Sequence, residues 1–339
     1  MGLAIKELIQ SHEIQSKELA RKPLAIDAYN MLYQFLTTIR SRDGSLLTDS
    51  KGNVTSHLVG LFSRATNFLE QDLQLVYVFD GKPPELKKLE RDRRRTVKQE
   101  AAVQFKRAEE AQDIEGMKKY AARTAVLSKR MVEESKQLVQ ALGIPIIQAP
   151  SEGEAQAAAL AREGHVYASV SQDFDSLLYG TPRLVRNLSV VGKRKRPNSP
   201  IFESIHPEMI NFKETLGALG ISQEQLIVLA ILVGTDYNPG GVKGIGPKNA
   251  LKLVKEYNNR YDALFQALPW QHDASWKEVY DTIVSMPVTK DVRIHWESID
   301  GDAVTKMLVG EHEFSPERVA NALDKLQLQH KQSGLRQFF

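Results

Sequence analysis

Hydrophobic and polar positions in the N-terminal half of the chain follow two alternating patterns. Apolar residues recur with helical spacing over about 28–40, 55–71 and 125–142. Between these segments lie short apolar runs, rich in Val, Ile and aromatic residues, that are typical of buried strands: Leu24–Ile26, Leu75–Phe79, Ile144–Ile147 and Val166–Val170. Because strands alternate with helices, residues 1–206 are predicted to form an α/β domain with a mainly parallel sheet covered on both faces.

The pattern changes after Tyr179. The segments Arg183–Val191 and Pro200–Ile205 flank the polar stretch Gly192–Ser199, which predicts a hairpin at the edge of the sheet. From residue 207 to about 329 the apolar residues recur with helical spacing. This second part is therefore predicted to be all-α.

Charge is concentrated in one stretch of the chain. Residues 83–130 are poor in large apolar side chains, which favours exposed helices or an arch over core. Within Lys82–Arg107, ten basic residues accompany four acidic ones, and a second basic cluster is Lys193–Arg196. Such clusters contact phosphate backbones in some proteins and are solvated helix faces or import-like runs in others. Charge alone does not decide between the two.

Composition narrows the class of protein. The 339 residues include no cysteine, which excludes disulfides, thiolate zinc sites and cysteine nucleophiles. No apolar run approaches the roughly 18 residues that span a bilayer. The opening segment, residues 1–22, has an amphipathic helical pattern and not the organisation of a secretory signal. We expect an intracellular protein without a membrane association.

Carboxylates follow the ends of the predicted strands. Seven acids arrive there from five segments of the chain: Asp27, Asp80, Glu152, Glu154, Asp173, Asp175 and Asp236. The carboxyl ends of parallel strands meet at one edge of a sheet, which is where open α/β sheets bind ligands. Two like charges about 4 Å apart repel by roughly 4 kcal/mol at an effective dielectric near 20. Either several of these acids are protonated, or divalent cations lie among them.

All-oxygen ligation suits Mg²⁺ or Mn²⁺, and two such ions hold a phosphodiester, generate hydroxide and stabilise a leaving oxygen. Each acid also has an ordinary alternative, such as a helix cap or a turn, and Ser151 with Glu154 has the spacing of a capping box. The coincidence across five segments favours the metal interpretation.

A glycine-rich hairpin, residues 240–248, joins two predicted helices. Its glycines allow a ligand to approach the backbone, and Pro247 suits the first turn of the following helix. Free N–H groups with Lys243, Lys248 and Lys252 nearby predict a phosphate-binding seat, although a plain helix–helix turn is the alternative.

Lys87 and Arg94 lie seven residues apart, on one helix face shortly after Asp80. Such cations balance charge on a scissile phosphate in an enzyme, and in other proteins they are ordinary members of a basic stretch.

Together these segments resemble the flap endonuclease family of structure-specific 5′ nucleases, and archaeal members most. The matching motifs are MGLAIKELI, AIDAYNMLYQF, YVFDGKPPELK, APSEGEAQAA, SQDFDSLLYG and LVGTDYNPGGVKGIGPKNA. The resemblance implies a mixed, mainly parallel central sheet flanked by helices, a helical arch at about 83–130 through which a 5′ strand threads, and two Mg²⁺ ions, replaceable by Mn²⁺. It implies metal binding by the seven acids, phosphate contacts from Lys87 and Arg94, base stacking on Tyr33, and a position near the active site for Gly2.

The resemblance also identifies the glycine hairpin as the helix–two-turn–helix element that grips duplex DNA and holds K⁺. The DNA-binding residues that it implies there are Lys243, Gly244, Gly246, Lys248 and Lys252. The tail, residues 330–339, resembles a sliding-clamp (PCNA) peptide of the form Q-x-x-L-x-x-F-F, with Gln332, Leu335, Phe338 and Phe339 as anchors. Without a partner, two terminal Phe residues would be an exposed apolar end.

The expected function is 5′ flap endonuclease, with associated 5′–3′ exonuclease activity, acting on branched DNA in replication and repair by two-metal-ion hydrolysis. It would lie in the cytoplasm of an archaeal cell or the nucleus of a eukaryotic one. Two alternatives remain: a junction-resolving nuclease of the same fold, and a non-catalytic clamp-binding DNA adaptor.

Overall fold

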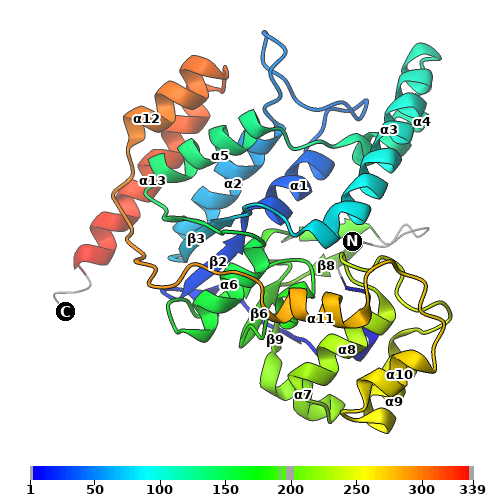
Figure 1. The fold of residues 1–339 in the computed structure, drawn as a ribbon. Helices are drawn as coiled ribbons and strands as arrows, with labels where there is room; N and C mark the ends of the chain where they lie inside the picture. The colour runs from blue at the N-terminus through cyan, green and yellow to red at the C-terminus, as the bar shows by residue number, and fades with distance from the viewer. Residues whose placement is uncertain (1–2, 191, 196–201, 336–339) are drawn as a thin grey trace.

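A seven-stranded mixed sheet organises the molecule (Figure 1). The computed structural model describes residues 3–190, 192–195 and 202–335. The strand order is β1-β9-β6-β5-β2-β3-β4. Strands β2 to β6 pair in parallel, whereas β9 is antiparallel to both β6 and β1. The strands are β1 (His12–Glu13), β2 (Pro23–Asp27), β3 (Gln74–Phe79), β4 (Ile146–Gln148), β5 (Ala168–Val170), β6 (Arg183–Arg186) and β9 (Glu208–Asn211). The predicted α/β class with a mixed, mainly parallel sheet is confirmed.

Helices cover both faces of this sheet. One face carries α1 (Ala28–Thr38), α2 (Ser56–Glu70) and α5 (Lys129–Ala141), and the other carries α6 (Gly153–Arg162). Helices α1, α2 and α5 lie within a few residues of their predicted ranges. Their starts are set by side chains, since Asp27 accepts the Asn30 N–H at the first turn of α1 and Ser128 accepts the Met131 N–H at that of α5.

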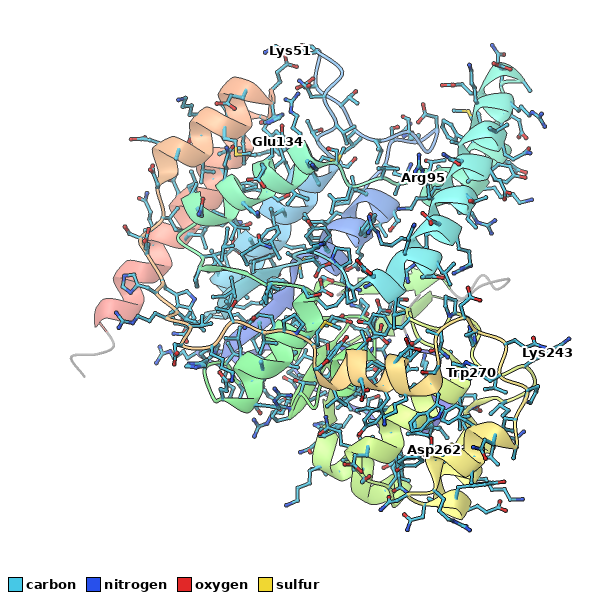
Figure 2. All side chains as sticks on the ribbon, viewed as in Figure 1. Lys51, Arg95, Glu134, Lys243, Asp262 and Trp270 are labelled. Carbon is cyan, nitrogen blue, oxygen red and sulfur yellow. The ribbon has the colours of Figure 1, made fainter. Side chains whose placement is uncertain are left out.

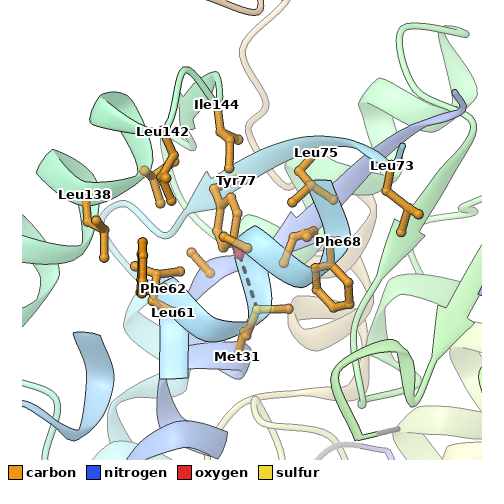
Figure 3. Close-up of a cluster of buried hydrophobic side chains, with 14 of the residues drawn as sticks. Met31, Leu61, Phe62, Phe68, Leu73, Leu75, Tyr77, Leu138, Leu142 and Ile144 are labelled. Carbon is orange, nitrogen blue, oxygen red and sulfur yellow. Dashed lines mark hydrogen bonds between the residues drawn. The ribbon is translucent and has the colours of Figure 1, made fainter. Parts of the chain in front are cut away.

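The main core lies between the sheet and the α1–α2–α5 layer. Tyr77, from the middle of β3, is packed among Leu61, Phe62 and Phe68 of α2, and its hydroxyl donates a 3.5 Å hydrogen bond to the sulfur of Met31 (Figure 3). Burying these large side chains contributes on the order of 1.5–3 kcal/mol each. This packing fixes the first turn of α1 at the carboxyl edge of the sheet.

A helical hairpin projects from the body of the molecule (Figure 1). It consists of α3 (Lys88–Glu110) and α4 (Ile114–Ala121), whose small residues Ala101 and Ala108 are buried where the two helices pack. Its other side chains are mostly exposed. The exposed helices expected within 83–130 are therefore present, and the base of α3 lies beside the sheet edge.

The second core surrounds α8 (Gln223–Val233), in which every residue from Gln225 to Leu232 is buried. The helices around it are α7 (Phe212–Leu219), α9 (Pro247–Tyr257), α10 (Tyr261–Gln266) and α11 (Trp276–Val284). Among the described residues no single helix is long and apolar enough to cross a membrane; α7 and α8 reach that composition only as a pair, which is bent by 76°.

The last part of the chain returns to the first core. The segment 287–300 crosses the α6 side of the sheet, where Trp296 donates a hydrogen bond to the Leu75 carbonyl. Helices α12 (Gly301–Thr305) and α13 (Pro316–Leu335) then pack near α5 and α2, separated by a π-helical turn (Lys306–Glu311). Residues 207–329, expected as one helical part, thus pack in two places, because the apolar face of α13 fits the N-terminal core.

Three local predictions were wrong. Residues Glu208–Asn211, expected as helix, form β9, because Met209 and Ile210 are buried in pairing with β6. The predicted hairpin is shifted: β7 (Gly192–Lys195), expected as the turn, pairs with β8 (Phe202–Ile205) in a separate two-stranded sheet. The opening amphipathic segment forms two short 3₁₀ helices, Lys6–Leu8 and Ser16–Leu19, on either side of β1.

Candidate active site

The sheet edge gathers the carboxylates from five segments of the chain. Asp27 ends β2, Asp80 follows β3, and Asp173 and Asp175 follow β5. Glu152 and Glu154 belong to the start of α6, and Asp236 follows α8. All seven predicted acids line one cavity of about 470 Å³. The structure therefore brings together side chains that are up to about two hundred residues apart in sequence.

Three of the carboxylates accept a hydrogen bond from a neighbouring N–H or O–H group. Asp80 accepts the Gly153 backbone N–H at 2.7 Å, which links the end of β3 to the start of α6. Asp175 accepts the Leu3 N–H at 3.0 Å. Glu154 accepts the Ser171 hydroxyl at 2.8 Å. These contacts fix one oxygen of each group and orient the other for a ligand.

The acids carry more negative charge than the surrounding protein compensates. Burial, followed by the charge of Glu152, raises the pKa of Asp80 to about 6. Burial, followed by the charges of Asp173 and Asp236, raises the pKa of Asp175 to about 7. The pKa values of Asp27 and Glu154 are likewise raised well above their ordinary values, first by burial and then by neighbouring carboxylates.

Cations from the base of the helical hairpin line the same cavity and form ion pairs with its acids. Lys87 Nζ lies 2.5 Å from Glu152 Oε2 and 3.2 Å from Asp236 Oδ2. Arg94 Nη2 lies 2.5 Å from Asp236 Oδ1. Although burial opposes the charged forms, these carboxylates raise the pKa values of both Lys87 and Arg94. The two predicted basic residues thus face the acids directly.

The donor set suits a divalent cation, although it is not arranged as a finished ligand shell. Within the described ranges, no three acidic or histidine side chains surround a common point in the way that ligands of one ion would. The carboxylates are instead spread over the cavity wall, and Lys87 lies between two of them. The oxygen-only donors and the raised carboxyl pKa values are what Mg²⁺ or Mn²⁺ would satisfy. Which acids hold an ion stays a prediction.

Five residues that line the cavity were not foreseen from the sequence. Tyr29 and Asn30 follow Asp27 in the first turn of α1, and Arg93, Val97 and Lys98 belong to α3. Asn30 Nδ2 donates to Asp173 Oδ2 at 2.9 Å. The helical spacing of Asn30 from Asp27 was a usable signal, because the first turn of a helix that starts at a sheet edge faces the ligand crevice.

Tyr33 also lines the cavity, and its ring is already covered by a cation. Lys98 Nζ lies 4.6 Å from the ring centroid. A nucleobase that stacks on Tyr33 would have to share or displace this contact. The stacking role stays a prediction.

The glycine hairpin lies apart from the cavity residues, between α8 and α9. Gly241 and Gly244 have φ values of +56° and +84°, and a Cβ on Gly241 would lie 2.4 Å from the Leu232 carbonyl. Gly246 precedes Pro247, the first residue of α9. The Lys243 side chain points outward at the edge of the molecule (Figure 2), and Lys248 and Lys252 are exposed as well. The hairpin thus has the open, basic surface that a phosphate seat needs.

The structure describes some of the predicted clamp anchors, whereas the others and Gly2 lie outside the described residues. Gln332 and Leu335 belong to the last turns of α13. Gly2, Phe338 and Phe339 lie outside the described residues. The clamp-binding role of the tail and the position of Gly2 stay predictions.

The sequence of this chain is similar to those of known proteins. The XPG N-terminal domain matches residues 2–101 and the XPG I-region matches residues 143–236. Flap endonuclease 1 of Pyrococcus abyssi is 51% identical over 342 residues, covering 100% of this chain and 98% of that protein. Flap endonuclease 1 of Hyperthermus butylicus is 50% identical, covering 98% of this chain and 96% of that protein.

The fold of this chain is also similar to solved structures. Flap endonuclease-1 from Methanococcus jannaschii is similar with a TM-score of 0.75 at 41% identity, covering 96% of this chain and 98% of that one. The catalytic core of Rad2, solved in complex with a DNA substrate, has a TM-score of 0.70 at 22% identity, with 96% of this chain and 100% of that one covered. At that identity the second likeness concerns the fold alone.

Proposed function

The chain belongs to the flap endonuclease family of DNA nucleases, and we propose that it hydrolyses a phosphodiester near the base of a 5′ flap in branched DNA. The observation that carries the proposal is the cavity itself. Seven carboxylates line it together with Lys87 and Arg94. A phosphodiester in this cavity would meet both metal-binding oxygens and cations.

The carboxylates would bind two Mg²⁺ ions, which Mn²⁺ can replace. Asp80, Glu152, Glu154 and Asp173 would hold one ion, and Asp175 and Asp236 the other, with Asp27 in support. When bound, the ions supply a metal-activated hydroxide and stabilise the leaving oxygen, which gives 5′-phosphate and 3′-hydroxyl ends. The chain needs no protein nucleophile for this reaction.

Lys87 and Arg94 would change partners during the reaction. In the structure they neutralise Glu152 and Asp236. With divalent ions held by the same carboxylates, Glu152 and Asp236 would no longer need Lys87 and Arg94 for charge balance. The two side chains would then be free to contact the scissile phosphate and to stabilise the charge that builds up on it. Tyr33, at the same cavity, would stack a base of the strand being cut.

The remaining elements would hold the rest of the substrate. The glycine hairpin, with Lys243, Lys248 and Lys252, would grip the duplex and hold K⁺, and the α3–α4 hairpin would form the arch around the 5′ strand. The tail would dock Gln332, Leu335, Phe338 and Phe339 on a sliding clamp (PCNA). Replication and repair intermediates with a 5′ flap are the substrates that this arrangement suits, and 5′–3′ exonuclease activity would use the same site.

The test is Asp173→Ala, assayed on a double-flap DNA with Mg²⁺. We expect flap binding to persist while the cleavage rate falls at least about 1,000-fold, which corresponds to about 4 kcal/mol. Asp72→Ala, a loop acid on the protein surface beside Arg21, is the matched control and should cut at the normal rate. Near-normal cutting by Asp173→Ala would reject the assignment.

The substrate preference needs a separate comparison. Turnover on flap, nicked and four-way-junction DNA distinguishes a flap endonuclease from a junction-resolving relative. Absence of Mg²⁺-dependent cleavage on all three, with DNA binding intact, would instead support a non-catalytic adaptor. An acidic cavity opposes that reading, since a carboxylate cluster weakens binding to phosphates unless cations neutralise it.

A further inference from the structure

Glu90 is a buried acid that the proposed reaction does not use. It lies in the first turn of α3, between Lys87 and Arg94, and is 3% exposed. The surrounding stretch of the chain is strongly basic and mostly solvated. A carboxylate in such a place is costly to bury unless its oxygens are fully hydrogen-bonded.

Two arginines saturate the Glu90 carboxylate. Arg93 donates from Nε at 2.6 Å and from Nη2 at 2.8 Å, one bond to each oxygen. Arg94 donates from Nε at 2.6 Å to the oxygen that also accepts Arg93 Nη2. Although burial opposes ionisation, these bonds lower the pKa of the Glu90 carboxyl. Glu90 therefore stays charged in the interior.

The guanidinium of Arg94 is held at two points. Nε binds Glu90 on the same helix, whereas Nη2 binds Asp236, which is 142 residues away and lines the cavity. A guanidinium is rigid and planar, so fixing its Nε leaves the Nη groups to reach either Asp236 or a ligand in front of it. If Asp236 binds an ion, the bond to Glu90 remains.

We propose that Glu90 is a positioning residue that anchors Arg94 while Arg94 transfers from Asp236 to the scissile phosphate. This inference rests on the proposed nuclease function. Glu90 does not touch the substrate. It keeps the guanidinium at the cavity wall at the moment when its second partner is withdrawn, so that Arg94 does not swing into solvent along α3. Arg93, bound to the same carboxylate, completes the charge balance.

Glu90→Gln is the central variant, because it keeps the side-chain shape but replaces one acceptor oxygen with an N–H donor that faces arginine. We expect the single-turnover cleavage rate to fall about 10- to 100-fold, the loss that follows from misplacing a group by about 1 Å. Flap binding measured with Ca²⁺ in place of Mg²⁺ should change less than about threefold. Glu100→Gln, an exposed acid on the same helix, is the matched control and should cut normally.

A double-mutant cycle separates positioning from general support of the fold. In an Arg94→Ala background, Glu90→Gln should slow cleavage by no more than about twofold, because the group it positions is gone. An equal loss in both backgrounds would overturn the proposal.

The controls keep this inference distinct from the nuclease function. Mg²⁺-dependent cutting by the unmodified chain and its loss in Arg94→Ala test the function itself. If both hold and Glu90→Gln cuts at the normal rate, only the role of Glu90 is rejected. If Glu90→Gln lowers the melting temperature by more than a few degrees, the double-mutant cycle still decides the question, because both backgrounds carry the same change at Glu90.

Discussion

At the scale of single residues, the carboxylates in the cavity repel one another, and a bound cation would reduce this repulsion. The pKa of Asp80 is about 6 and that of Asp175 about 7 in the folded chain, whereas the ordinary Asp value is 3.8. Between about pH 4 and pH 7 the folded state therefore binds more protons than the unfolded state. The free energy of unfolding of the metal-free protein should fall as the pH rises through this window.

Asp175→Asn tests this repulsion. Because the amide removes one buried charge, the metal-free variant should melt at least about 2 °C higher than the unmodified protein at pH 8, and the difference should shrink toward pH 4. The gain in melting temperature on adding Mg²⁺ should be smaller in the variant. Scanning calorimetry at both pH values measures each effect. A variant that melts lower at pH 8, with a full response to Mg²⁺, would contradict the assignment of Asp175.

Asn30 provides a second residue-scale prediction. Its side chain donates to Asp173 at 2.9 Å and accepts the Gln172 N–H at 3.3 Å, so it fixes one predicted metal ligand. Asn30→Ala should weaken divalent-cation binding by about 10-fold, as loss of an outer hydrogen-bond partner usually does. Titration calorimetry with Mg²⁺ in the absence of DNA measures this. Asn67→Ala, on the exposed side of α2, is the control.

The seven acids could be predicted because each of them follows an apolar strand or helix that the sequence pattern shows. Glu90 was missed, because it looked like one more solvated charge in a basic stretch. Its carboxylate is bound by Arg93 and Arg94, and the contact from Arg94 to Asp236, 142 residues later, has no local pattern that predicts it. Asn30 was missed although its spacing from Asp27 places it in the first turn of a helix at the sheet edge.

At the scale of elements, the parallel strands were predictable and the antiparallel edge was not. The strands β2, β3, β4 and β5 are continuous apolar runs because helices cover both faces. Strand β9 has only four residues, Glu208–Asn211, of which the two central ones are buried and the outer two partly exposed, so its pattern does not distinguish strand from helix. Its identity is set by pairing with β1 and β6, whose partners lie up to 197 residues away.

The glycine hairpin is the element with the clearest DNA-binding test. Lys243→Ala removes one exposed cation, so flap-DNA affinity should fall and the slope of log affinity against log salt should decrease in magnitude by about 0.9. The rate at saturating DNA should change little. Fluorescence anisotropy over a series of KCl concentrations measures the slope. Lys213→Ala, exposed on α7 outside the hairpin, should leave it unchanged, and an unaltered slope in Lys243→Ala would remove Lys243 from the interface.

At the scale of the whole molecule, the C-terminal part of the chain returns to pack against the N-terminal core. Segment 287–300 carries it from the helical part back over the sheet, and α13 ends on the N-terminal core, far from the glycine hairpin in Figure 1. The clamp-binding tail would therefore leave from the nuclease core. A partner held there would not compete with duplex DNA gripped by the hairpin.

Deleting residues 336–339 tests the tail. Removal of two aromatic anchors should raise the Kd for a sliding clamp by at least about 30-fold, which corresponds to about 2 kcal/mol. The ratio of flap-cleavage rates with and without clamp should approach one. Mutation of Lys325 to alanine, on α13 before the tail, serves as the control. Full stimulation of the shortened chain would show that the clamp binds elsewhere.

Helix α8 ends within three residues of Asp236, and the glycine hairpin begins four residues after it. The same helix, buried from Gln225 to Leu232, thus supports both the cavity and the surface that would receive the duplex. If the hairpin grips the duplex, the number of nucleotides between the gripped duplex and the broken bond would be set by the length of one short turn. The cut should therefore fall at a constant distance from the gripped duplex, whatever the base sequence or the length of the flap.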